Sequence, residues 1–556
     1  MRLLILLCCC SILHGQSDSV RLVRVLEDYA GYGRSDSTNL WGLATDATVA
    51  ADIAFLDDLR SRVPAPESLS SAQRIDRALL AFVLDDRLYR LRFGHHLFPL
   101  DAEGGFLASV IYRVSGRRIR TEEDYADYLT RLRALPQFFA GQQVNMERGL
   151  AAGKTNPRLV VERNIELIDR TLATGAEQSM FVNPVADHEA RTAEVHKLVR
   201  DTLYPAYARL GNFLRDDYLP ALPAGIGISG ITDGKEFYRQ RVRFYTTTEL
   251  TPEEVFATGE AEVARIRTEM DEIIARTGFS GTYAEFLEFL RTDPQFYADT
   301  PQALLDRAAW ITNRIQTEMP RYFTKLPRMP LVVAPVPAAL APNYTGGRYS
   351  PGSSDNRRAG QFWVNTYDLP SRPLYTLPAL ALHEGVPGHH TQMMLAAELE
   401  AVSDFRRDLY LSAFGEGWAL YGEYLGEEMG VYATDYEKFG RLTYEMWRAC
   451  RLVVDPGMHY FGWSRERAVA YMADHTALSL REVNSEIDRY IGWPGQAVSY
   501  KMGELTIRRL RKEAEAALGD NFDLAEFHNL ILADGAVTMS LLERRVRAYI
   551  DRGGRN

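Results

Sequence analysis

The pattern of apolar positions predicts that the segment from about residue 20 to about residue 330 is mainly helical. Polar N-cap residues mark several helix starts. Ser70 precedes an apolar-periodic stretch, and Thr251 and Thr300 are each followed by proline at the first helical position. After Thr251, Glu253 lies in the first turn, where the helix dipole favours a carboxylate. We therefore expect a helical N-terminal half.

The pattern changes near residue 327. Two short runs rich in β-branched and aromatic residues predict strands at 330–336 and 361–366, and the Gly-, Pro- and Ser-rich stretch 346–354 predicts a loop between them. Beyond residue 374 the pattern is helical again. We expect a mainly α fold with a small β-sheet. The edge of this sheet either pairs with an extended substrate backbone or only packs on the helices.

The organisation of the chain indicates one large folded unit. Of the 556 residues, 46% are apolar and 25% are charged. Neither a flexible linker nor an internal repeat divides the sequence. We therefore expect a helical N-terminal lobe at 17–330 and a metal-site lobe of the same unit at 331–552.

Residues 1–16 resemble a secretory signal, because Arg2 precedes a short apolar core and a cleavage point near residue 15 or 16. The segment is too short to span a membrane. We expect an exported protein, periplasmic or extracellular, with no membrane span. Only five apolar residues precede Cys8, which disfavours a lipid anchor there. The net charge of −10 argues against a nucleic-acid partner.

The stretch 383–390, HEGVPGHH, gathers three imidazoles and one carboxylate around a Pro-Gly break. It directly follows a strongly apolar run at 377–382. A histidine followed by glutamate is the first half of a zinc-hydrolase signature, because the imidazole holds the metal and the carboxylate handles the proton of an activated water. We therefore expect His383 to be a zinc ligand and Glu384 to be the general base.

The second ligand depends on how the chain bends at the Pro-Gly pair. The usual pattern places the second histidine at i+4, and Pro387 occupies that position here. On an ideal helix His389 lies about 120° around the axis from His383, and His390 lies about 10 Å further along it. Because Pro387-Gly388 favours a kink or bulge, we expect His389 to be the second ligand, with His390 as the alternative.

The segment 414–423 predicts a helix with apolar residues on one side and Glu416 near its start. A catalytic zinc site has three protein ligands and an open position for water. We therefore expect Glu416 to supply the third ligand from a second helix. For Glu423 we favour a solvated surface position, with orientation of a histidine ligand as the alternative.

This region contains four motifs, namely HEGVPGHH at 383–390, EGWALYGE at 416–423, RLVVDPGMH at 451–459 and PGQAVSYKMG at 494–503. Together they resemble a bacterial domain-of-unknown-function family of predicted zinc metallopeptidases. More distantly, the order His-Glu, His, Glu is similar to the helical peptidases related to angiotensin-converting enzyme and thimet oligopeptidase. The resemblance implies a large helical zincin-like peptidase fold, one zinc ion and a peptide substrate.

These residues predict a specific chemistry. A zinc ion held by His383, His389 and Glu416 activates water, and Glu384 transfers its proton to the leaving amine. Tyr500 and His459 are the candidates for stabilising the oxyanion. Two alternatives remain, which are hydrolysis of non-peptide amides or esters and a non-catalytic, zinc-stabilised binding protein. A purely structural site needs no general base, so Glu384 favours an enzyme.

Overall fold

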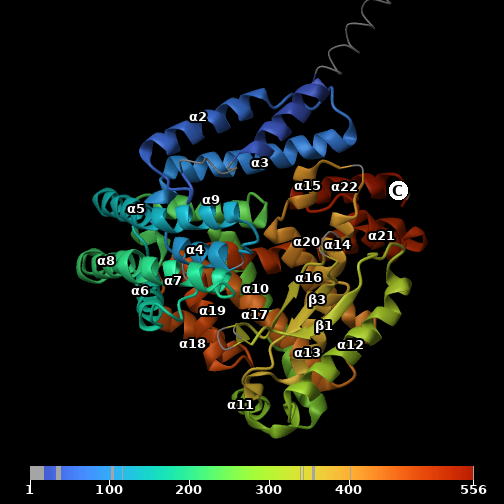
Figure 1. Cartoon of the computed structure of the whole chain (residues 1–556). Coiled ribbons are helices and arrows are strands. Elements are labelled where there is room, and N and C mark those ends of the chain that lie inside the picture. The colour runs from blue at the N-terminus through green and yellow to red at the C-terminus, as the bar shows by residue number, and fades with distance from the viewer. Residues whose placement is uncertain are drawn as a thin grey trace, which may run out of the picture. The chain divides into compact units, whose positions relative to one another are not determined.

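The structure is a computed structural model. It describes residues 18–32, 39–101, 105–115, 117–338, 340–341, 344–353, 357–400 and 402–554. The predicted signal segment at 1–16 lies outside these residues. Helices dominate the described chain and one small sheet accompanies them (Figure 1), which confirms the predicted mainly α fold.

The contacts divide the chain into two compact units. Unit 1 comprises the chain up to Tyr238 with Met458–Ser464 and Ile487–Pro494, and unit 2 comprises Arg239–Gly457, Arg465–Glu486 and the chain from Gly495 onward. The boundary therefore differs from the one predicted at residue 330. The helix Pro301–Tyr322 (α12) contacts the sheet and later helices of unit 2, so this stretch belongs with the C-terminal elements.

Unit 1 is built from helices. They include α2 (Asp46–Arg62), α3 (Ser71–Phe93), α4 (Gly105–Ser115), α5 (Glu122–Ala152), α6 (Arg158–Ala173), α7 (Glu189–Leu198), α8 (Tyr204–Asn212) and the start of α9 (Gly234–Thr246). Helix α3 begins as predicted, because the Ser70 side chain accepts a hydrogen bond from the Gln73 amide in a capping box.

Unit 2 holds the remaining helices. They are α10 (Pro252–Thr277), α11 (Tyr283–Thr292), α12, α13 (Leu377–Leu380), α14 (His389–Ala397), α15 (Asp404–Asp408), α16 (Ser412–Glu428), α17 (Asp435–His459), α18 (Arg465–His475), α19 (Leu480–Gly492), α20 (Ser499–Leu518), α21 (Leu524–Leu532) and α22 (Met539–Asp551); α17 and α19 also have residues in unit 1. The helix starts predicted after Thr251 and Thr300 are confirmed, since both threonines cap the helices that follow them.

The sheet has three strands, β1 (Leu331–Pro335), β2 (Gly347–Ser350) and β3 (Gly360–Val364), in the order β1-β3-β2. Strand β1 is parallel to β3, and β2 is antiparallel to it. The strands predicted at 330–336 and 361–366 are confirmed. The predicted loop at 346–354 is wrong in part, because residues 347–350 form the edge strand β2. Its alternating burial is hidden in the sequence by its glycine and serine content.

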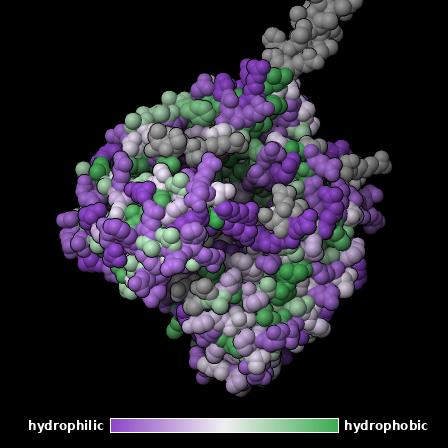
Figure 2. All heavy atoms as spheres, in the orientation of Figure 1, coloured by the Kyte–Doolittle hydropathy of each residue, from purple (hydrophilic) through white to green (hydrophobic). Residues whose placement is uncertain are grey.

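The sheet packs where the HEGVPGHH motif begins. Strands β2 and β3 contact the π-helical turn Ala381–Gly385, and β1 contacts α12. In Figure 1 the sheet lies beside α12, α13 and α16. Figure 2 shows mostly hydrophilic residues on the visible face, with apolar residues scattered among them. Among the described helices, none combines the length and apolar character that a membrane span requires.

Candidate metal centre

The HEGVPGHH motif breaks its helix as its Pro-Gly pair predicts. Helix α13 runs into the π-helical turn, Val386 is extended, and a new helix begins at His389. The Gly388 amide donates a hydrogen bond to the Leu382 carbonyl at 3.0 Å. A β-carbon on Gly388 would lie 1.9 Å from the His383 carbonyl oxygen, so only glycine permits this close passage. The break brings two helix segments together around the motif.

This break places His383 and His389 side by side, with ring centroids 4.9 Å apart and planes at 89°. Glu416 approaches from α16, and its Oε2 lies 3.5 Å from His383 Nε2 and 3.3 Å from His389 Nε2. Ligand atoms about 2.1 Å from a tetrahedral ion lie roughly 3.4 Å apart. The three residues brought together are the three predicted ligands, and their spacing fits a zinc-sized ion.

The charges of this group favour a cation. Burial opposes the charged imidazolium of His383, yet its hydrogen bonds with Glu416 and Glu423 raise its pKa to about 9. Burial also opposes the Glu416 carboxylate, but the imidazoles of His389 and His383 hold the pKa of Glu416 well below its usual value. A metal ion would take the place of the His383 proton beside the Glu416 carboxylate, because both imidazole and carboxylate bind metal in their deprotonated forms.

Glu423 orients the first histidine. Its Oε1 lies 2.7 Å from His383 Nδ1 and 3.4 Å from Arg448 Nη2, and the residue is only 1% exposed. The predicted solvated surface position is therefore wrong. The reason is close packing of α16 on the motif, since a β-carbon on Gly426 would lie 2.4 Å from Leu382. The seven-residue spacing from Glu416 was the available signal, because it places both carboxylates on one helix face.

His390 lies outside the group. Its Nδ1 is 3.0 Å from the Tyr349 hydroxyl and its Nε2 is 3.0 Å from the Met329 carbonyl oxygen. Burial lowers the pKa of His390 to about 4, which keeps it neutral. With both ring nitrogens engaged, it is held by the sheet side of the motif, and His389 is the histidine that joins the ligand group.

Glu384 lies beside the group on the π-helical turn and is buried. Its Oε2 accepts a hydrogen bond from the Tyr349 amide of β2 at 2.7 Å. Sequence reasoning missed this role of Tyr349, because the residue falls in the stretch predicted to be a loop. The bond fixes the orientation of the Glu384 carboxylate, which a proton-transferring group next to a metal needs.

Two tyrosines complete the surroundings. The Tyr410 hydroxyl donates to Glu416 Oε1 at 2.7 Å, although the residue is 46% exposed. Burial of the phenol and the nearby Glu416, Tyr500 and Glu384 raise the pKa of Tyr410 well above its usual value. Tyr500 is therefore close to this group. Sequence reasoning missed Tyr410. The available signal was the glycine at position 415, because a β-carbon there would lie 2.5 Å from the Tyr410 ring and would displace it.

Close helix packing brings Tyr500 to this position. A β-carbon on Gly417 of α16 would lie 2.6 Å from the Gly503 backbone of α20, so two glycines let these helices touch. The Arg451 guanidinium lies 4.1 Å from the centre of the Tyr500 ring, which holds the ring by a cation–π contact.

His459 does not join the group, and its predicted oxyanion role is corrected. It belongs to unit 1, where its Nδ1 accepts a hydrogen bond from the Ile228 amide at 3.1 Å and its Nε2 donates to the Tyr490 carbonyl at 2.9 Å. Burial lowers its pKa to about 4. Both ring nitrogens are thus used in packing, and neither is available to a substrate.

The solved structures that are similar to this chain include two bacterial proteins. A "putative lipoprotein" from Colwellia psychrerythraea has a TM-score of 0.85 and 27% identity, and the match covers 98% of this chain and 99% of that protein. A "putative lipoprotein of unknown function" from Shewanella oneidensis shares the fold, with a TM-score of 0.71 and 18% identity over 96% of this chain and 98% of that protein. Comparison with curated proteins gives no match.

The family described as "Bacterial protein of unknown function (DUF885)" matches residues 26–546. That range contains the four motifs and every residue of the candidate metal centre. Because the match spans nearly the whole chain, this protein belongs to the bacterial DUF885 family.

Proposed function

We propose that this protein is a zinc-dependent hydrolase that cleaves peptide bonds. The observation that carries the proposal is the group of His383, His389 and Glu416, whose ligand atoms lie within 4.8 Å of one another beside Glu384. Three ligands of these types with a neighbouring carboxylate are typical of catalytic zinc sites, whereas structural sites usually have four ligands. The distances between the ligand atoms fit the ion, and Glu423 supplies the carboxylate that commonly orients a histidine ligand.

When bound, zinc supplies Lewis acidity, which polarises a carbonyl and lowers the pKa of water towards ~7. The residues around it have separate tasks. Glu384 accepts the proton of the attacking water and returns it to the leaving amine, and its bond from the Tyr349 amide keeps the carboxylate oriented. Glu423 holds His383 in the tautomer that directs Nε2 towards Glu416.

The oxyanion of the transition state needs a donor besides the metal, and loss of one such donor typically costs ~10²–10³ in rate. We assign this task to Tyr500, whose ring is held by Arg451. Tyr410 is the positioning residue for Glu416, because its hydroxyl already donates to that carboxylate.

The exposed edge of strand β2 favours a peptide substrate. The backbone amide of Asn365 donates a hydrogen bond to the Gly346 carbonyl at 2.9 Å. Because the bonded pairs of an antiparallel ladder alternate, the main-chain groups of Arg348 face β3. Those of Gly347 and Tyr349 face away from β3. The outward Tyr349 amide meets Glu384. Because Glu384 already accepts the Tyr349 amide hydrogen, a peptide that added to this edge would bond the main-chain groups of Gly347 and would pass the general base. An ester without a peptide backbone would gain no such contacts.

The test combines metal content with activity. Purified protein should hold about one zinc per chain. Glu416→Ala should lose it, while Glu427→Gln, which lies about three turns from Glu416 on α16, should keep it. Glu384→Gln should keep zinc and lose hydrolysis of a peptide panel. Zinc-free wild type after zinc is supplied would contradict the proposal. Turnover of acyl-amides or esters without peptide turnover would redirect it to the non-peptide class.

We also propose that the protein is exported. Residues 1–16 resemble a secretory signal, and the similar protein from Colwellia psychrerythraea is described as a putative lipoprotein. Cell fractionation with N-terminal sequencing of the mature protein tests this. Labelling with a radioactive fatty acid, with Cys8→Ala as the control, distinguishes a lipid-anchored form from a free one. Recovery of the intact chain in the cytoplasm would contradict export.

A further inference from the structure

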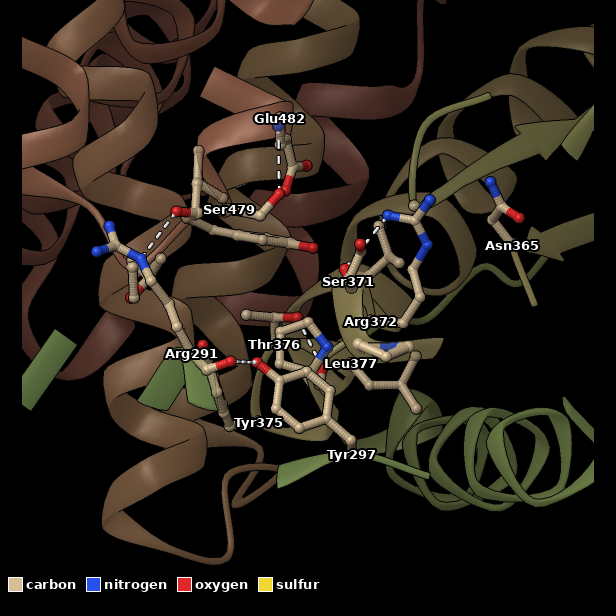
Figure 3. A pocket seen from close by; sticks show the side chains of 18 of the residues that line it. Arg291, Tyr297, Asn365, Ser371, Arg372, Tyr375, Thr376, Leu377, Ser479 and Glu482 are labelled. Atoms are coloured by element: carbon tan, nitrogen blue, oxygen red, sulfur yellow. Dashed lines mark hydrogen bonds between the residues drawn. The ribbon is translucent and has the colours of Figure 1, made fainter. Parts of the chain in front are cut away.

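A second cavity lies in unit 2, apart from the metal ligands. Its volume is about 300 Å³. Its walls come from helices α11, α17 and α19 and from the segment that precedes α13 (Figure 3). None of His383, His389 or Glu416 lines it. Small-molecule sites span about 300–1,000 Å³, so this cavity fits a ligand at the small end of that range.

The lining contains buried polar atoms that lack a partner. Arg372 Nε, Tyr375 Oη and Thr443 Oγ1 make no hydrogen bond within the described part of the chain. Tyr375 is 3% exposed and Thr443 is 0% exposed, so both residues are buried beside the cavity. The Arg291 guanidinium of the lining, in contrast, donates hydrogen bonds to the carbonyls of Thr476 and Leu478. Native proteins keep few unsatisfied groups, and three of them belong to residues that line this one cavity.

Two opposite charges also face this cavity. Arg372 donates one bond, to the Ser371 carbonyl, and its Nε remains free. The Glu482 carboxylate has neither a hydrogen bond nor an ion pair with any described residue. Burial and the neighbouring Glu486 raise the pKa of Glu482 to about 7, although Arg372, Arg448 and Arg451 oppose this. A cationic group bound beside Glu482 would stabilise its ionised form.

Part of the remaining wall is apolar. Leu304, Leu377 and Leu380 line the cavity together with Val364. A ligand that satisfied the whole lining would therefore carry an anionic group, a cationic group and a small apolar part.

We propose that this cavity binds a free α-amino acid with an apolar side chain, its carboxylate on Arg372, its ammonium on Glu482 and its side chain against the leucines. The cavity pairs both charges of the ligand within one small volume. A longer peptide, which would place only one of its charged ends in the cavity, would not supply both charges there. The proposal does not depend on catalysis at the metal centre.

The test is isothermal titration calorimetry of the full-length protein with L-leucine. N-acetyl-L-leucine removes the ammonium and L-leucinamide removes the carboxylate, so each should bind at least about tenfold more weakly, the cost of one charge-assisted hydrogen bond. Arg372→Gln and Glu482→Gln should each weaken L-leucine binding by a similar factor. Arg481→Gln, which removes an exposed charge beside Glu482, should leave binding unchanged.

Circular dichroism and thermal unfolding establish that each variant is folded, and Arg372→Lys, which keeps the charge and loses the planar fork, replaces Arg372→Gln if that variant does not fold. Binding should persist after chelator treatment, because no lining residue belongs to the metal group. No heat of binding at millimolar L-leucine overturns the proposal. The proposal is also overturned if N-acetyl-L-leucine binds as tightly as L-leucine, or if both cavity variants bind L-leucine as tightly as the wild type does.

Discussion

Replacement of Glu482 by glutamine should stabilise the protein at high pH. The folded-state pKa of Glu482 is raised from 4.5 to about 7, because burial and Glu486 disfavour its charge more than the nearby arginines favour it. A carboxyl group with a raised folded pKa holds its proton more tightly in the folded state than in the unfolded state. Folding stability is therefore lost as the pH rises from about 4.5 to about 7, and the loss is complete above that range.

The magnitude follows from the same values. One unit of pKa corresponds to about 1.36 kcal/mol, so the interval from 4.5 to about 7 corresponds to about 3 kcal/mol. Glutamine has the shape of the protonated acid and does not ionise. We therefore expect Glu482→Gln to raise the free energy of unfolding of unit 2 by about 3 kcal/mol at pH 8 and by less than about 1 kcal/mol at pH 5.

The measurement is urea unfolding of the wild type and the variant at both pH values, followed by tryptophan fluorescence. Glu272→Gln, which removes an exposed carboxylate from α10, is the matched control and should change little at either pH. A Glu482→Gln variant that is less stable than wild type at pH 8 would refute the reasoning. That result would mean that Arg372, Arg448 and Arg451 stabilise the ionised carboxylate more than burial destabilises it.

Three further predictions concern the metal centre. Glu423→Gln should weaken zinc binding about 10–100-fold in chelator competition, because the charge beside His383 Nδ1 is lost; equal affinity would exclude an orienting role. Gly388→Ala should lose zinc and destabilise unit 2 by at least about 3 kcal/mol, since its β-carbon would overlap the His383 carbonyl; normal zinc content would contradict this. His390→Ala should keep full zinc in metal analysis, because its ring nitrogens bond Tyr349 and Met329, and loss of zinc with an intact fold would reverse the ligand assignment.

Local features were predictable from the sequence because they depend on neighbouring residues. Ser70, Thr251 and Thr300 cap helices through side-chain bonds within one turn, and two of the three strands follow from β-branched and aromatic runs. The break at Gly388 follows from local Pro-Gly chemistry. The three candidate ligands followed from residue type and spacing alone.

Other features depended on elements far apart in the sequence. Tyr349 and Tyr410 reach the candidate metal group through an edge strand and a loop, and Glu423 reaches it through a glycine-lined helix contact. The helical spacing places Glu423 on the face of Glu416, but only the helix contact buries it. The Glu482 cavity likewise assembles residues from about 290 to 480. The amino-acid sequence by itself determined the helix caps, the kink and the ligand types, since these rest on short-range geometry. Only the tertiary structure decided which carboxylates are buried, because burial depends on which distant surfaces pack together.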